Sequence, residues 1–223
     1  MARLRRLEWP GHTHYLIQRG HGALQERGVF ADASDRASFL AVLNEAARAE
    51  AVQVHAYALL HLELQLLATP SEAGALGRLM QALGRRYVSA YNRRHGHRGS
   101  LWDGRFRCAV VEPGATRLAL LQLVDGQSNE PDHTSASARL GGTRPPLLTD
   151  PPEWWTLGNT PFEREAAYRQ RLTLGLPAGQ AQGLRQAALG GWAAGSPAFT
   201  AEVAEATARP ARPRARGRPR NAG

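Results

Sequence analysis

The segment of residues 84–107, GRRYVSAYNRRHGHRGSLWDGRFR, combines arginine with aromatic side chains more densely than the rest of the chain. Guanidinium groups bind phosphates and release counterions, and aromatic rings can stack on unpaired bases. The segment therefore predicts a nucleic-acid-binding surface; the alternative is a solvated helix face whose rings turn into the core. The candidate phosphate-binding side chains are Arg85, Arg86, Arg93, Arg94, Arg98, Arg105 and Arg107. The candidate base-stacking rings are Tyr87, Tyr91 and Trp102.

The pattern YxxxYNRRHGxxGxLWxGRFR in this segment resembles the signature of the IS200-like single-tyrosine (Y1, HUH-type) transposases, and in particular their REP-associated branch. The resemblance continues through HYLIQRG at 14–20, HAYALL at 55–60, LLATP at 66–70 and WTLGNTPFEREAAYR at 155–169. It implies a bacterial protein whose partner is hairpin or single-stranded DNA. In an intact member, the resemblance implies that a His-x-His pair holds a divalent metal ion and that a tyrosine attacks the phosphate during DNA transposition, which leaves a covalent phosphotyrosine.

The chain departs from the family at both catalytic motifs. Glu63 and Gln65 stand where the resemblance places the two histidines, and His61 stands where the family has proline. The position of the nucleophilic tyrosine falls at or near Leu123, and residues 92–167 contain no tyrosine. We therefore expect a DNA-binding pseudoenzyme with no catalytic residues and no cofactor, for which the name transposase describes ancestry.

Two alternatives stay open. On a strand, His61, Glu63 and Gln65 alternate onto one face, where they could hold Mg²⁺ or Mn²⁺ in an active single-strand nuclease or transposase. Tyr87 or Tyr91 would then have to replace the nucleophile. The structural alternative is that the three polar residues form the outer face of an edge strand. The other possibility is an RNA-binding or protein-interaction module, although the expected strands lack the paired exposed aromatics of RNA-recognition sheets.

The apolar periodicity predicts an α+β protein with a ferredoxin-like β-α-β-β-α-β order, in which one antiparallel sheet carries two helices on one face. This domain would span residues 1–125. We expect strands at 12–18, 52–60, 62–68 and 105–111, and helices at 35–50, 71–91 and 116–124.

The remainder of the chain changes in composition. Residues 126–153 are rich in Gly, Ser, Pro and Asp and predict a loop, and residues 154–206 predict an extension of two short helices, at 160–175 and 180–205. Residues 207–223 form an Arg/Pro-rich tail that we expect to be disordered alone. Its Arg216, Arg218 and Arg220 resemble the core of an AT-hook, which inserts into the minor groove; the alternative is a polybasic tail with general phosphate affinity.

The composition agrees with a partner that is a polyanion. The net charge is +9, from 28 basic and 19 acidic residues, and every basic residue is an arginine. The single cysteine, Cys108, excludes an internal disulfide framework and predicts a small buried strand residue in a reducing compartment. We find no secretory segment and no apolar run of membrane length, which predicts a cytoplasmic, nucleoid-associated protein. The sequence leaves open whether it is a monomer or a homodimer.

Overall fold

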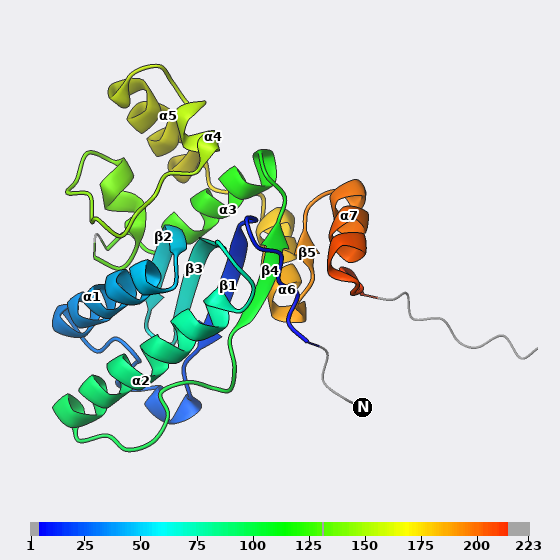
Figure 1. The fold of residues 1–223 in the computed structure, drawn as a ribbon. Coiled ribbons are helices and arrows are strands. Elements are labelled where there is room, and N and C mark those ends of the chain that lie inside the picture. Colours follow the sequence, from blue (N-terminus) through cyan, green and yellow to red (C-terminus); the bar gives the residue numbers. More distant parts are fainter. Residues whose placement is uncertain (1–4, 131, 214–223) are drawn as a thin grey trace, which may run out of the picture.

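The computed structural model describes residues 5–130 and 132–213, which fold as α+β around a five-stranded sheet. The first half contains β1 (His14–Arg19), α1 (Ala33–Ala49), β2 (Val52–Leu60), β3 (Glu63–Pro70), α2 (Ala75–His95) and β4 (Arg107–Val111). The strand order is β2-β3-β1-β4-β5, and the first four strands pair antiparallel. The predicted ferredoxin-like order is therefore confirmed (Figure 1).

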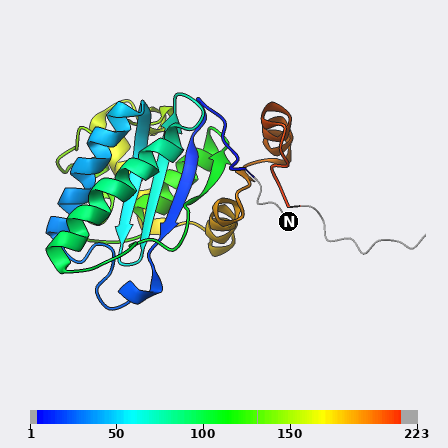
Figure 2. The same ribbon diagram turned by 60° about the horizontal axis from the view of Figure 1, so that its bottom comes forward.

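The helices α1 and α2 cover one face of the sheet (Figure 2). In α2, Leu76, Leu79, Leu83, Tyr87 and Tyr91 recur every three or four residues, so they form one buried stripe. The helix ends at Gly96, whose φ of +63° is a left-handed conformation that favours glycine. The predicted apolar stripe of this helix is thus confirmed.

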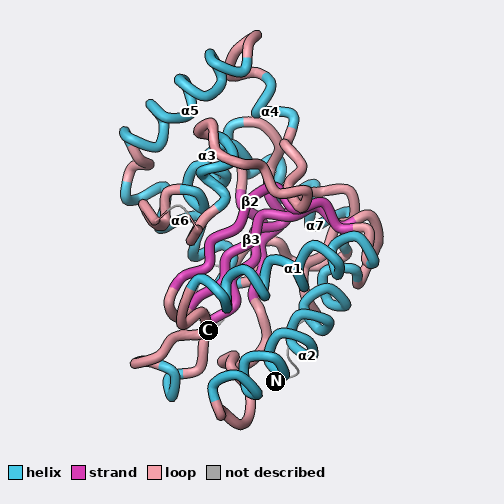
Figure 3. The backbone as a smooth tube through the Cα atoms, turned by 90° about the vertical axis from the view of Figure 1, so that its left-hand side faces the viewer, coloured by secondary structure: helices cyan, strands magenta, loops and turns pink. Residues whose placement is uncertain are grey.

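The opposite face of the sheet is also covered, which goes beyond the predicted arrangement with helices on one face only. There α3 (Ala115–Asp125) and α6 (Ala178–Gly190) pack on Tyr15, Ile17 and Ala109. Figure 3 shows the two helix layers on either side of the strands. Because β3 lies between β2 and β1, it is a central strand, and the expectation of an edge strand around Glu63 and Gln65 is wrong.

Residues 132–151 run along the outer edge of β2, where they form more contacts than the predicted loop implies. The amide of Leu59 donates to the carbonyl of His133, and the amide of Thr149 donates to the carbonyl of Val54, both between backbone groups. The segment also contains a short 3-10 helix, Ser135–Arg139. Covering an edge strand in this way satisfies backbone groups that would otherwise be available to another chain.

The C-terminal extension contains more elements than the two predicted helices. It comprises α4 (Pro152–Trp155), α5 (Pro161–Leu174), α6, β5 (Ala193–Ala194) and α7 (Pro197–Thr207). The expected helix at 180–205 is interrupted because Gly191 adopts a φ of +71° and β5 then pairs in parallel with Val110 and Val111 of β4. The helix expected at 160–175 is confirmed, with Thr160 as its N-cap.

The remaining expectations concern Cys108, the arginines of the tail and membrane-spanning segments. Cys108 is buried in β4, as predicted. The AT-hook-like residues Arg216, Arg218 and Arg220 lie outside the described residues. Among the helices that the structure describes, none has the length and apolar character to cross a membrane.

Candidate nucleic-acid interface

The three positions of the degenerate metal motif do not come together. Glu63 and Gln65 point from β3 toward the α3 and α6 side of the sheet, but His61 lies in the two-residue turn between β2 and β3. Its Nε2 forms a hydrogen bond with the carbonyl oxygen of Gln25 at 2.7 Å. The turn breaks the strand alternation, so the expectation that all three share one face is wrong.

An arginine from α6 pairs with Glu63. The Arg185 guanidinium donates to both carboxylate oxygens of Glu63, at 2.8 and 2.9 Å. Such a two-pronged pair matches the planar fork of arginine to the carboxylate. Arg185 is far from Glu63 in sequence, and no local pattern among the 28 arginines marks it.

The amide of Gln65 is also fully engaged. Its Oε1 accepts a hydrogen bond from the Tyr15 hydroxyl at 2.7 Å, and its Nε2 donates to Glu63 at 2.7 Å and to Gln127 at 3.2 Å. Burial raises the pKa of Tyr15 well above its usual range, so this phenol stays protonated. Because the oxygens that could bind a divalent ion are held by Arg185 and Tyr15, the donor set does not fit Mg²⁺ or Mn²⁺ in this arrangement. Among the described residues, no group of three or more His, Cys, Asp or Glu side chains is placed to bind a metal.

Leu123, the predicted position of the lost tyrosine, lies beside this motif. It is part of α3 and packs partly buried on the core of that face. Its carbonyl oxygen accepts from Gln127 Nε2 at 3.0 Å, and Gln127 Oε1 in turn accepts from Gln65. The two altered positions are therefore neighbours in space, joined through one glutamine.

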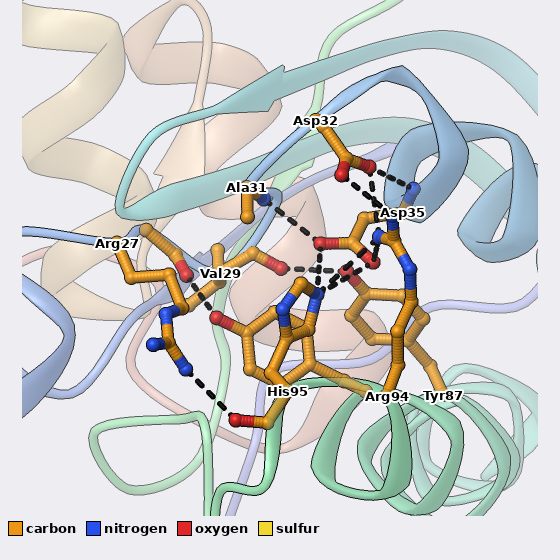
Figure 4. Close-up of polar contacts among 10 residues, drawn as sticks. Arg27, Val29, Ala31, Asp32, Asp35, Tyr87, Arg94 and His95 are labelled. Atoms are coloured by element: carbon orange, nitrogen blue, oxygen red, sulfur yellow. Dashed lines mark hydrogen bonds and ion pairs between the residues drawn. The ribbon is translucent and has the colours of Figure 1, made fainter.

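Tyr87 and Tyr91 are not available as nucleophiles or as stacking platforms. Both rings are 1% exposed, and their hydroxyls donate to the carbonyl oxygens of Val29 and Gly28 at 2.6 and 2.7 Å. Burial raises the pKa of both phenols. Their predicted alternative roles are therefore corrected to packing of the loop before α1 on α2 (Figure 4). Trp102 is partly buried and packs on the core that contains Phe30.

Two of the seven candidate arginines are paired with acids. Arg94 bonds both oxygens of Asp32, at 2.8 and 2.6 Å, and approaches Asp35 at 2.5 Å (Figure 4). Arg86 forms an ion pair with Glu45 of α1. Their contacts with α1 and with the loop before it give these two side chains a structural role, which the sequence pattern did not separate from phosphate binding.

The other five candidate arginines are exposed and form no ion pair with any described residue. They are Arg85, Arg93, Arg98, Arg105 and Arg107. The first two lie on α2, the next two lie on the loop that follows, and Arg107 begins β4. Exposed guanidinium groups without acidic partners keep their full charge available to a polyanion.

Arg105 and Arg107 line two adjoining cavities at the start of β4. One cavity, of about 280 Å³, is also lined by Arg19, Asp103 and Leu189, and we call it the motif-side cavity. The other, of about 220 Å³, is lined by Arg5, Arg6, Arg105, Arg107, Trp192 and Arg209 among others, and we call it the β4 cavity. Arg19 Nε lies 4.0 Å from Glu63 Oε2, so the motif-side cavity leads to the altered metal motif.

No family model matches the chain, and no curated protein matches it. The chain is similar to a solved structure described as a REP-associated tyrosine transposase bound to a REP hairpin, with a TM-score of 0.42 and 12% identity over 56% of this chain and 70% of that one. It is also similar to a Deinococcus radiodurans R1 protein with a provisional transposase name, with a TM-score of 0.38 and 21% identity over 57% of this chain and 98% of that one. The first neighbour is named as a REP-associated tyrosine transposase and the second only as a transposase, and at these scores the likenesses do not assign a family or an activity to this chain.

Proposed function

We propose that the protein is a DNA-binding member of the IS200-like single-tyrosine transposase family that no longer cleaves DNA. The single observation that carries the proposal is the pairing of Glu63 with Arg185 at the altered metal motif, next to a cavity lined by the unpaired Arg105 and Arg107. The unpaired arginines support the DNA-binding half of the proposal, and the engagement of the Glu63 and Gln65 oxygens inside the protein supports the loss of cleavage.

The DNA-binding half of the proposal rests on the five unpaired arginines. Each phosphate that an arginine neutralises releases a counterion, so the affinity should fall steeply with salt. Arg105 and Arg107 form part of both cavities, which would place a bound strand along the start of β4. The preferred partner is hairpin or single-stranded DNA, as the sequence resemblance implies.

The loss of cleavage rests on two independent positions. Glu63 and Gln65 use their oxygens inside the protein, and Leu123 has no hydroxyl group that could attack a phosphate. Tyr15 is near this motif, but its hydroxyl is buried and donates to Gln65. A variant nuclease would have to expel Arg185 and recruit another nucleophile.

Recognition of RNA on the sheet surface is less compatible with this structure. Modules of that type stack bases on exposed aromatics of a four-stranded sheet. Here α3 and α6 pack on the face that α1 and α2 leave open. RNA affinity is therefore an outcome of the binding test and not a second proposal.

The test is a combined binding and cleavage assay with a labelled DNA hairpin that carries single-stranded flanks, with and without Mn²⁺. We expect salt-dependent binding with no nicking and no covalent adduct. Metal-dependent nicking would contradict the loss of cleavage. Absence of DNA binding at low salt, or tighter binding to single-stranded RNA than to the hairpin, would contradict the DNA-binding half.

A further inference from the structure

The β4 cavity is built by segments that are far apart in the sequence. Residues 5–7 run beside β4, residues 190–192 connect α6 to β5, and Arg209 follows the end of α7. Figure 1 shows these segments converging on the β4 side of the sheet. The short strand β5 pairs in parallel with Val110 and Val111, and the cavity lies where β4 begins, beside residues 190–192, which precede β5.

The charge of this cavity is unbalanced. Among the described residues its lining includes Arg5, Arg6, Arg105, Arg107 and Arg209 and no carboxylate, and Arg6 has interactions of its own. The Arg6 guanidinium lies over the Phe106 ring at 3.7 Å, which holds one side of the cavity in place. Like charges gathered in a partly desolvated space repel one another unless an anion lies between them.

Arg209 is the lining residue whose hydrogen-bonding groups are least satisfied. Its Nε and one terminal nitrogen are buried and have no hydrogen-bond partner. Burial disfavours the charged form and lowers the pKa of Arg209. The guanidinium lies over the Trp192 ring at 5.8 Å, and an anion in the cavity would supply acceptors for the two nitrogens that lack a hydrogen bond.

The backbone holds Arg209 at the cavity. The preceding Ala208 has a φ of +49°, a left-handed conformation that is uncommon for a residue other than glycine. After this turn, the Arg209 amide donates to the carbonyl of Ala204, and the Ala193 amide donates to the carbonyl of Ala211 at 2.8 Å. Backbone hydrogen bonds of Arg209 and Ala211 thus hold the segment that bears the Arg209 side chain.

We propose that the β4 cavity binds a phosphate group of a DNA strand and that Arg209 is the residue that fixes it. The identity of the strand rests on the proposed function, whereas the affinity for phosphate rests on the cavity alone. Arg105 and Arg107 belong to both cavities, so a strand anchored here would continue toward Arg19 and the altered metal motif.

The first experiment measures binding of inorganic phosphate to the full chain by thermal unfolding, with sodium chloride at equal ionic strength as the reference. We expect phosphate at ten times its Kd to raise the Tm of the wild type by about 3 °C. Arg209→Gln should abolish the rise. Arg212→Gln removes the same charge from an exposed residue nearby and should leave the rise intact. Equal responses of the two variants would overturn the proposal.

The second experiment measures affinity for the DNA hairpin as a function of salt. Arg209→Gln should weaken binding about tenfold and reduce the magnitude of the log–log salt slope by about one, with a smaller effect for Arg212→Gln. If the wild type binds DNA but Arg209→Gln behaves like the wild type in both assays, the cavity proposal is wrong and the proposed function stands. If phosphate stabilises the protein through Arg209 but no DNA binds, the cavity proposal stands and the proposed function is wrong.

Two further variants keep the tests decisive if Arg209→Gln does not fold. Arg5 is exposed and lines the same cavity, so Arg5→Gln should weaken both phosphate and DNA binding without disturbing the core. Arg209→Lys retains the charge but not the planar fork and should recover part of the phosphate effect. An unchanged response in Arg5→Gln together with full loss in Arg209→Lys would also count against a phosphate site.

Discussion

The arginines at the end of α2 and those at the start of β4 belong to the same stretch of sequence but have opposite environments. Arg94 lies against two aspartates before and within α1, and His95 Nε2 lies 2.9 Å from Asp35 (Figure 4). Arg105 and Arg107 form no ion pair with a described residue. They line the β4 cavity, whose described lining has no acid, and the motif-side cavity, whose lining has one, Asp103. Arginine density alone therefore does not identify a nucleic-acid surface. Which arginines stay available to DNA depends on where the acids lie, and the positions of the acids depend on the fold.

The strongest test of the acid-paired region is Asp35→Ala. Asp35 is 2% exposed and accepts hydrogen bonds from the Ala31 amide and from Arg94. Its removal should lower the free energy of unfolding by about 3 kcal/mol, because the buried partners lose their acceptor. Urea unfolding measures this change.

The same variant separates structure from binding. At a temperature where Asp35→Ala is folded, its affinity for the DNA hairpin should stay within about twofold of the wild type, since Arg94 is not part of the β4 edge. A large gain in DNA affinity would show that Arg94, once released, joins the binding surface, and the division between the two regions would then be weaker than proposed.

The matching test of the unpaired region is the double variant Arg105→Gln/Arg107→Gln. We expect DNA affinity to fall about 30-fold and the salt slope to decrease by about two, because two phosphate contacts are lost. Arg86→Gln is the control, since Arg86 is already paired with Glu45. Equal losses in the control and in the double variant would mean that binding follows net charge and not position.

A third prediction concerns the arginine at the metal motif. Arg185→Ala leaves the Glu63 carboxylate without its main partner and should cost about 1–2 kcal/mol of unfolding free energy. It should not produce nicking with Mn²⁺, because Leu123 still supplies no nucleophile. Gel analysis of a labelled hairpin checks the second point, and any cleavage would show that Arg185 alone blocks activity.

The smallest expected effect is a loss of stability in mild acid. Burial lowers the pKa of His14 and of His55 to about 4, below the usual value of 6.5. The unfolded chain binds these protons first, so the stabilisation present above pH 6.5 is lost as the pH falls toward 4. Between pH 7 and pH 5.5 each histidine should cost about 1 kcal/mol. DNA binding by the folded fraction should persist, because arginines stay charged over this pH range. If stability and the DNA affinity of the folded protein fell together, the prediction would be contradicted.

Local patterns predicted the fold better than they predicted the site. Periods of two and of three to four residues place β1 to β4, α1 and α2, and the same period shows Tyr87 and Tyr91 on one helix face. The sequence cannot reveal which arginine meets which acid. The pair between Arg185 and Glu63 joins α6 to β3, and its formation depends on the packing of α6 across the sheet.

The edge elements were missed for a related reason. Residues 126–153 have the composition of a loop, yet Ser135 and Thr149 bond the backbone of β2. Strand β5 is two residues long, too short for any periodic signal, and it exists because β4 offers an unpaired edge. Such features follow from tertiary contacts, which a single sequence does not state.

The guanidinium beside Glu63 is a cation that cannot diffuse away. It neutralises the Glu63 carboxylate for as long as the chain is folded, without a metal from solution. We therefore expect the protein to bind DNA equally well with excess EDTA and with millimolar Mg²⁺ at equal ionic strength. Its occupancy on DNA would then be independent of the cellular supply of divalent ions, whereas a metal-dependent relative would respond to it.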